Sequence, residues 1–268
     1  MIDFHTHVFP EKIAQRSVSV LAEKAGIKPY TDGTPSDLRR HAKESGVSLA
    51  VVLPVITRED QFDSIFRFAC KINEENDTLF SFGAVYPGDQ DLKDRLKLIK
   101  EYGLKGIKIH PDYHGIDLSD DRTMELIYEA AALDLVISVH AGVDIGIPDP
   151  VRSTPQMALR IINEIGPEKM ILAHTGGWKL WDDVEGLLVG KAVYFDISFT
   201  DGYIDPGQWK RIIVNHGTDK ILFGSDSPWS SEDKTAEAIY KLGLSAKDNL
   251  NIFENTAKKL LNIDQGNI

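Results

Sequence analysis

Two histidines near the start of the chain, in Asp3-Phe-His5-Thr-His7, have the spacing of a metal-binding pair. Side chains of a β-strand alternate between its two faces, so histidines separated by one residue point the same way. Neutral imidazoles are good ligands for zinc and other transition metals. The pair alone is a weak signal, and it gains meaning only if more ligands follow later strands.

Further residues of the ligand type do close later apolar runs, at His110, His140, His174 and Asp226. Two glycines follow His174, and glycine lets the backbone approach a ligand closely. Each of these histidines alone is more simply explained as a hydrogen-bonded or packed residue. Five of the eight histidines in the chain lie at such ends, however, together with an aspartate, and this coincidence favours a metal site.

The elements that would position these residues are short β-branched runs alternating with longer amphipathic ones. Eight strand–helix units in 268 residues predict a (β/α)₈ TIM barrel, in which the active site lies at the carboxyl ends of the strands. A doubly wound open sheet is the competing fold, but no Gly-x-Gly-x-x-Gly follows the first strand. The predicted strands are 2–5, 48–54, 80–86, 106–110, 136–140, 170–174, 192–198 and 220–226.

Amphipathic runs between the strands predict the helices, and nothing in the composition divides the chain. No linker or low-complexity tract interrupts it, so one domain over residues 1–268 is expected. The last helix is expected to pack against the outside of the barrel. The predicted helices are 11–25, 36–44, 61–76, 91–102, 122–133, 155–165, 207–215 and 255–261.

Composition limits the partners and the compartment. A net charge of −11 argues against nucleic acid and anionic membranes as partners, and a small-molecule substrate is expected. No apolar run is long enough to span a bilayer, and the first residues lack the pattern of a signal peptide. The single cysteine, Cys70, excludes an intramolecular disulfide, so a cytoplasmic location is predicted.

Taken in order, the motifs resemble the amidohydrolase superfamily, and within it the amidohydrolase 2 branch. That branch includes aminocarboxymuconate-semialdehyde decarboxylase and related decarboxylases and hydrolases. The resemblance covers essentially the whole chain. The matching motifs are Asp3-Phe-His5-Thr-His7, Gly106-Ile-Lys-Ile-His110-Pro111, Val139-His140-Ala-Gly142, Ala173-His174-Thr-Gly-Gly177 and Phe223-Gly-Ser-Asp226-Ser-Pro228.

The resemblance implies a metal-dependent enzyme with one divalent ion, expected to be Zn²⁺. Its ligands would be His5, His7, His140 and Asp226, with a water completing the coordination. His174 would orient or deprotonate that water, and Asp226 could also accept a hydrogen bond from it. A histidine has the intrinsic pKa for such proton transfer. The resemblance is also the only basis for expecting a homodimer.

Lys108 and His110 lie on the fourth predicted strand. In binuclear relatives a lysine at the end of this strand is carbamylated and bridges two metal ions. Lys108 lies two residues before His110, which predicts a position too deep for bridging. A structural or substrate-orienting role is favoured for it, with Asp3 or Asp196 as a carboxylate partner. His110, nearer the mouth, is predicted to contact substrate.

Loops after the strands should set the specificity. Trp178 and Trp229 follow the sixth and eighth predicted strands, where they either wall the substrate pocket or simply pack. Arg152 follows the fifth. A guanidinium binds carboxylate bidentately, so Arg152 is either a substrate-carboxylate ligand or a surface arginine.

Two reactions fit these residues. The first is hydrolysis of a C–N or C–O bond by a metal-activated water, and the second is non-oxidative decarboxylation of an unsaturated or aromatic acid. Short loops without an arginine cluster favour hydrolysis. A nuclease or phosphoesterase fits less well, because no glutamate ends the fourth strand. A metal-binding protein without activity is the remaining alternative, and the complete set of ligands argues against it.

Overall fold

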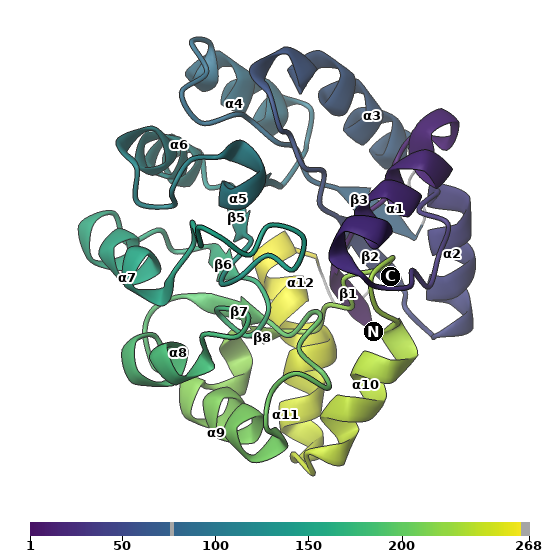
Figure 1. Ribbon diagram of the computed structural model, residues 1–268, viewed down its shortest axis with the longest axis vertical. Coiled ribbons are helices and arrows are strands. Elements are labelled where there is room, and N and C mark those ends of the chain that lie inside the picture. Colours follow the sequence, from purple (N-terminus) through teal and green to yellow (C-terminus); the bar gives the residue numbers. More distant parts are fainter. Residues whose placement is uncertain (76–77, 264–268) are drawn as a thin grey trace.

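Parallel strands alternate with helices along the chain in the computed structural model, which describes residues 1–75 and 78–263 (Figure 1). The strands pair in two sets, β1-β2-β3 and β4-β5-β6-β7-β8. They are β1 Ile2–Thr6, β2 Leu49–Val52, β3 Leu79–Ser81, β4 Gly106–Ile109, β5 Val136–Val139, β6 Met170–Leu172, β7 Tyr194–Asp196 and β8 Ile221–Leu222.

Backbone hydrogen bonds at two seams join these sets into one ring. Gly83 donates to Gly106 O at 2.8 Å, which connects the end of β3 to β4. Phe4 donates to Phe223 O at 2.8 Å, which connects β1 to the end of β8. The predicted (β/α)₈ barrel is therefore confirmed, and the open doubly wound sheet is excluded.

Helices surround the ring, and several begin with a capping residue followed by proline (Figure 1). The side chains of Thr34, Thr154 and Asp205 each accept a backbone hydrogen bond from the first helical turn, and each is followed by proline. No helix in the described ranges is long and apolar enough to cross a membrane. The helices are α1 Glu11–Ala25, α2 Pro35–Glu44, α3 Phe62–Glu75, α4 Leu92–Glu101, α5 Pro111–His114, α6 Asp121–Ala132, α7 Pro155–Glu164, α8 Trp181–Leu187, α9 Pro206–His216, α10 Glu232–Lys241, α11 Ala246–Leu250 and α12 Thr256–Leu261.

The last helix closes the floor of the barrel, which corrects the expectation that it packs against the outside. Ala257, Leu260 and Leu261 of α12 belong to one buried apolar cluster with side chains from β1, β2, β5, β6, β7 and β8. Phe4 and Phe82 of the same cluster meet edge to face at 5.8 Å, although β1 and the end of β3 are not neighbours in the ring. The cluster therefore fills the barrel interior, and in Figure 1 α12 lies behind the middle of the ring.

We predict that Phe82→Ala destabilises the barrel by about 3–5 kcal/mol, because it leaves a cavity in this interior cluster. The Phe82 side chain is fully buried. Urea unfolding should measure the loss, with Tyr128→Ala in α6 as the control. Tyr128 is 59% exposed, so its removal should change stability by no more than about 0.5 kcal/mol. Similar losses in both variants would contradict the assignment of Phe82 to the core.

His216, the last residue of α9, should make the fold sensitive to acid. Burial lowers the pKa of His216 to about 4, and its ring stacks on Phe195 at 3.9 Å. Between about pH 6.5 and pH 4 the unfolded chain binds a proton at this histidine that the folded chain does not. The stability that the neutral ring contributes is therefore complete above about pH 6.5 and is lost as the pH falls.

The size of this effect is on the order of 3 kcal/mol at most. We predict that His216→Gln loses less stability than the wild type when the pH falls from 6.5 to 4. Urea unfolding at several pH values measures both slopes, and equal slopes would contradict the assignment.

Candidate metal centre

Three ligand atoms converge at the mouth of the barrel, from β1, from the residue after it and from the loop after β8. Nε2 of His5 lies 3.1 Å from Nε2 of His7. Oδ1 of Asp226 lies 3.4 Å from the His5 nitrogen and 3.3 Å from the His7 nitrogen. Bonds of about 2.1 Å from Zn²⁺ to nitrogen and oxygen imply tetrahedron edges of about 3.4 Å. The three spacings therefore fit three corners of a zinc tetrahedron.

The hydrogen bonds behind the two imidazoles test whether a cation fits. Nδ1 of His5 faces Asp196 Oδ2 at 3.0 Å, and Nδ1 of His7 faces the carbonyl oxygen of Leu53 at 2.7 Å. Both partners are acceptors, so in the neutral rings Nδ1 carries the proton and Nε2 presents a lone pair. Two lone pairs and a carboxylate oxygen then face one another, and a divalent cation fits such a set.

Burial also suits these groups for binding a metal. Burial and the nearby Lys108 lower the pKa of His5 to about 4, so this imidazole is neutral at physiological pH. Burial opposes ionisation of Asp226, but the imidazoles of His5, His7 and His174 outweigh it and lower the pKa of this carboxyl. A neutral nitrogen ligand and a carboxylate are the protonation states that metal binding needs.

His174 lies beside this group, and His140 lies against His174; both are buried. The rings of His5 and His174 are 5.3 Å apart, and Nε2 of His174 lies 3.0 Å from Nδ1 of His140. Nε2 of His140 lies 3.9 Å from Asp112 Oδ2. The structure thus brings His5, His7 and Asp226 together, three of the four predicted ligands. The fourth, His140, contacts His174 beside them. The role of His140 as a ligand stays a prediction.

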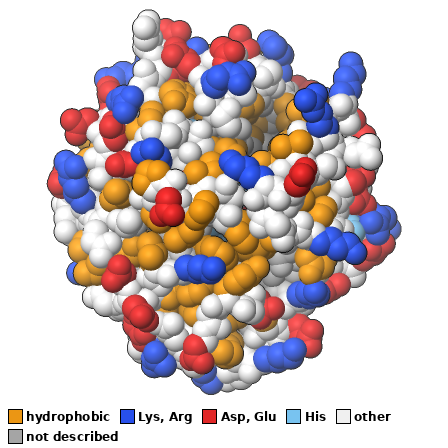
Figure 2. All heavy atoms as spheres, viewed as in Figure 1, with side chains coloured by type: hydrophobic (Ala, Val, Ile, Leu, Met, Phe, Trp, Pro, Cys, Tyr) orange, Lys and Arg blue, Asp and Glu red, His pale blue; other side chains and the backbone are white. Residues whose placement is uncertain are grey.

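His110, at the end of β4, lies flat against His140, with ring centres 4.1 Å apart. Its Nε2 is 3.4 Å from Asp144 Oδ2. Burial lowers the pKa of both histidines well below the usual value, so both rings are neutral. In the view of Figure 2, hydrophobic side chains gather over the middle of the face and charged ones lie mostly toward its edge.

Lys108 reaches the metal-ligating group. Its position two residues before His110 predicts a lysine too deep to bridge two metal ions, with Asp3 or Asp196 as its partner. In the structure its Nζ lies 3.2 Å from Nε2 of His5. The side chain is almost fully buried, and burial lowers the pKa of Lys108 to about 8. An amine in this position can donate a hydrogen bond into the cleft.

The three predicted loop residues have other contacts in the structure. Nη1 of Arg152 pairs with Asp117 Oδ1 at 2.8 Å. Trp178 is 3% exposed and donates its indole N–H to the carbonyl oxygen of Phe199. The half-buried Trp229 donates its backbone N–H to Asp226 O at 2.7 Å. For Trp178 the packing alternative fits the structure, and Arg152 is held by a surface carboxylate.

Sequence reasoning missed four polar residues that contact the histidines. Asp196 appeared only as a partner for Lys108, yet it ends β7 and follows the same strand-end rule as the ligands. Ser198 lies two residues further on, and its hydroxyl contacts Nδ1 of both His5 and His174. Asp112 and Asp144 lie in connections after β4 and β5, where no pattern in the sequence distinguishes them.

Comparison with known families agrees with this geometry. The family model described as amidohydrolase matches residues 2–263. The chain belongs to the amidohydrolase family. Its structural relatives include both decarboxylases and hydrolases, and members of this metal-dependent family are enzymes. The predicted resemblance is therefore confirmed, together with the prediction that the protein is an enzyme.

Solved structures share the fold at low sequence identity. An uncharacterised TIM-barrel protein from Bordetella bronchiseptica has a TM-score of 0.79 at 13% identity and covers 98% of each chain. A dihydroxybenzoic acid decarboxylase from a Polaromonas strain was solved with bound manganese and the inhibitor 2-nitroresorcinol. It has a TM-score of 0.72 at 15% identity, and the match covers 99% of this chain and 97% of that one. A probable 2-pyrone-4,6-dicarboxylic acid hydrolase from Acinetobacter baumannii, with citric acid bound, has a TM-score of 0.68 at 16% identity. The match covers 97% of this chain and 98% of that one. No curated protein matches the chain.

Proposed function

We propose that this amidohydrolase is a metal-dependent hydrolase that cleaves a C–N or C–O bond of a small organic substrate. The observation that carries the proposal is the group of His5, His7 and Asp226, whose lone pairs face one another within 3.4 Å beside His174. Hydrolases of this kind need a metal ligand set with an adjacent proton-transfer group.

The proposed metal ion is Zn²⁺, held by His5, His7 and Asp226, with His140 as the fourth predicted ligand. Bound there, the ion would polarise a carbonyl oxygen and lower the pKa of a water to about 7. His140 is a candidate for this role, because it lies 3.0 Å from His174, which is beside the triad, and its neutral ring has a lone pair to offer.

His174 is the proposed proton-transfer residue. Its Nδ1 lies 3.0 Å from the carbonyl oxygen of Ser198, which can only accept a hydrogen bond. In the neutral form of the ring the proton therefore sits on Nδ1, and Nε2 presents a lone pair toward Nδ1 of His140. Proton transfer by His174 would use this nitrogen, which would take a proton from the attacking water in place of the hydrogen bond from His140 and return it to the leaving group. Lys108 contacts His5 and His110 stacks on His140, and we assign to both the orientation of the substrate.

The pairing of Arg152 favours hydrolysis over decarboxylation. Arg152 is the predicted ligand for a substrate carboxylate, and its guanidinium is already paired with Asp117. A decarboxylase must bind a carboxylate, and this arginine is held by a carboxylate of the chain itself.

Non-oxidative decarboxylation of an unsaturated or aromatic acid is the second candidate. The structural relatives with manganese and with 2,6-dihydroxybenzoate support it, since both are dihydroxybenzoate decarboxylases. In this reaction His174 would deliver a proton to the ring carbon, and the C–C bond to the carboxylate would then break to release CO₂.

A substrate panel tests the proposal. The zinc- or manganese-loaded protein is assayed with lactones, esters and cyclic amides for hydrolysis, and with hydroxybenzoates and unsaturated acids for CO₂ release. We expect metal-dependent hydrolysis without CO₂. Release of CO₂ alone would overturn hydrolysis in favour of the second candidate. The cytoplasmic location and the homodimer remain part of the proposal, and sedimentation velocity tests the dimer.

A further inference from the structure

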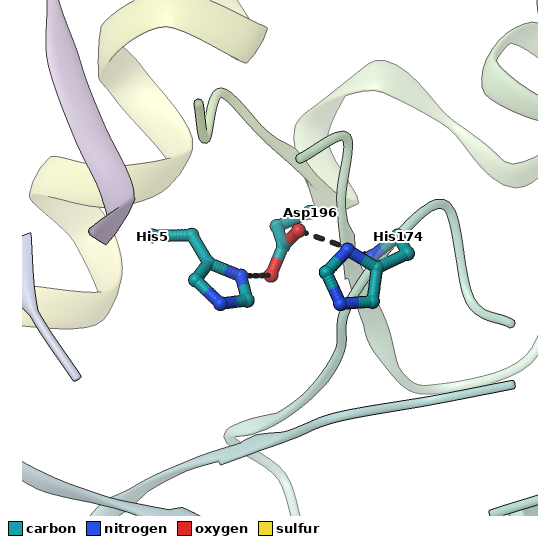
Figure 3. A group of neighbouring side chains, drawn as sticks. All are labelled: His5, His174 and Asp196. Atoms are coloured by element: carbon teal, nitrogen blue, oxygen red, sulfur yellow. Dashed lines mark hydrogen bonds and ion pairs between the residues drawn. The ribbon is translucent and has the colours of Figure 1, made fainter. Parts of the chain in front are cut away.

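Asp196 stands between the two histidines to which the proposed function gives the main roles. Figure 3 shows its carboxylate between His5 and His174. Oδ2 lies 3.0 Å from Nδ1 of His5, while Oδ1 accepts the backbone N–H of His174 at 3.2 Å. Oδ1 also accepts the backbone N–H of Ser198 at 3.1 Å. One buried carboxylate at the end of β7 thus contacts a proposed metal ligand and the loop that carries the proposed base.

The Ser198 hydroxyl links the same two rings. Its Oγ donates to Asp196 Oδ1 at 2.5 Å and lies 2.9 Å from Nδ1 of His5 and 3.0 Å from Nδ1 of His174. A hydroxyl has one proton, so once it donates to the carboxylate its lone pairs can only accept from the two imidazoles. Every partner of the two Nδ1 atoms is then an acceptor, and both neutral rings carry their proton on Nδ1.

We propose that Asp196 and Ser198 are positioning residues that keep Nε2 of His5 unprotonated for the metal ion and Nε2 of His174 unprotonated for proton transfer. This inference rests on the proposed function. The partner of a ligating histidine fixes its tautomer and ring orientation, and its loss typically costs about 10–100-fold in metal affinity. Here a single Asp–Ser unit would set the tautomers of the ligand and of the base together.

Asp196→Asn separates this role from mere packing, because asparagine has almost the same shape. Two backbone N–H groups point at Oδ1, so the amide oxygen must occupy that position. The amide NH₂ then faces Nδ1 of His5 and can only donate to it. The His5 proton is forced onto Nε2, the atom that the metal needs.

The experiment uses the full chain, with zinc as the probe. Zinc affinity is measured by chelator competition, and the proton positions of the histidines by ¹⁵N-edited NMR before zinc is added. Asp89→Asn is the matched control, because Asp89 is also buried and also accepts a backbone N–H, but in the connection between β3 and α4. Ser198→Ala is the second variant, which removes the hydroxyl without adding a donor.

We expect Asp196→Asn to bind zinc about 10–100-fold more weakly, with the His5 proton moved to Nε2, while Asp89→Asn matches the wild type. Ser198→Ala should weaken binding by about tenfold and alter the His174 resonances. Affinity within twofold of the wild type and unchanged histidine resonances would overturn the inference. If Asp196→Asn fails to fold, the same unchanged result in Ser198→Ala overturns it. A wild-type chain that binds no zinc would instead refute the proposed function.

Discussion

Asp226→Asn should release the metal ion and lower kcat/KM on the order of a thousandfold. Asp226 supplies the only carboxylate of the proposed ligand set, and asparagine cannot supply its negative charge. Metal-ion catalysis contributes several kcal/mol to transition-state stabilisation, and each 1.36 kcal/mol corresponds to about a tenfold change in rate. Elemental mass spectrometry should find less than a tenth of the wild-type metal in the variant, since binding needs the charged ligand.

The fold should tolerate this change. Asp226 has a φ of 71°, in the left-handed region that asparagine adopts almost as readily as aspartate. Its backbone N–H, which bonds to His5 O at 2.8 Å, is unaffected. Thermal unfolding of metal-free protein is the control, and the two midpoints should agree. A variant that keeps a full metal complement would show that Asp226 is not a ligand.

His174→Asn should keep the metal ion and lose activity, whereas Asp226→Asn should lose both. His174 lies beside the ligand group without belonging to the triad formed by His5, His7 and Asp226. General acid–base catalysis by a positioned side chain contributes about 10²–10⁴-fold, and kcat should fall by that factor. Asparagine suits the backbone at this position, because His174 has a φ of 59°.

Metal content and kcat measured on the same preparation decide the role of His174. Loss of metal together with activity would make His174 a ligand, and full activity would remove it from the mechanism. Comparison with Asp226→Asn on one substrate shows whether the two residues act at different steps.

The spacing of apolar residues along the sequence was sufficient to predict the architecture. Strands and helices of a barrel differ in the period of this spacing and in the length of the apolar run. All eight predicted strands occur, although β8 is only Ile221–Leu222 instead of the seven residues expected. The carboxyl ends of most strands were predicted too long. At β6 and β8 the chain leaves the extended conformation by His174 and Asp226, whose φ values are 59° and 71°. The position of α12 was wrong, since an amphipathic helix at the end of a chain carries no sign of whether it packs beside the barrel or beneath it.

The positions of site residues could be predicted where the residue lies at or near the end of a strand. They were harder to predict for residues in loops. His5, His7, Asp226 and His174 converge as their strand ends require. The contact of Arg152 with Asp117 depends on how two separate loops fold, which residue spacing does not encode. The contact of Lys108 with His5 was not predicted, because a carboxylate partner was expected and residue spacing does not encode the conformation of a long side chain.

The number of metal ions per chain decides whether this barrel holds the proposed single-ion site, and elemental mass spectrometry measures it on protein purified without a metal-affinity tag or chelator. We expect one equivalent of zinc or another divalent ion in the wild type, and its loss in Asp226→Asn. Two equivalents would contradict the single-ion site and return Lys108 to the role of a carbamylated bridge. No metal in the wild type, even after reconstitution, would refute the proposed mechanism and leave the barrel without it.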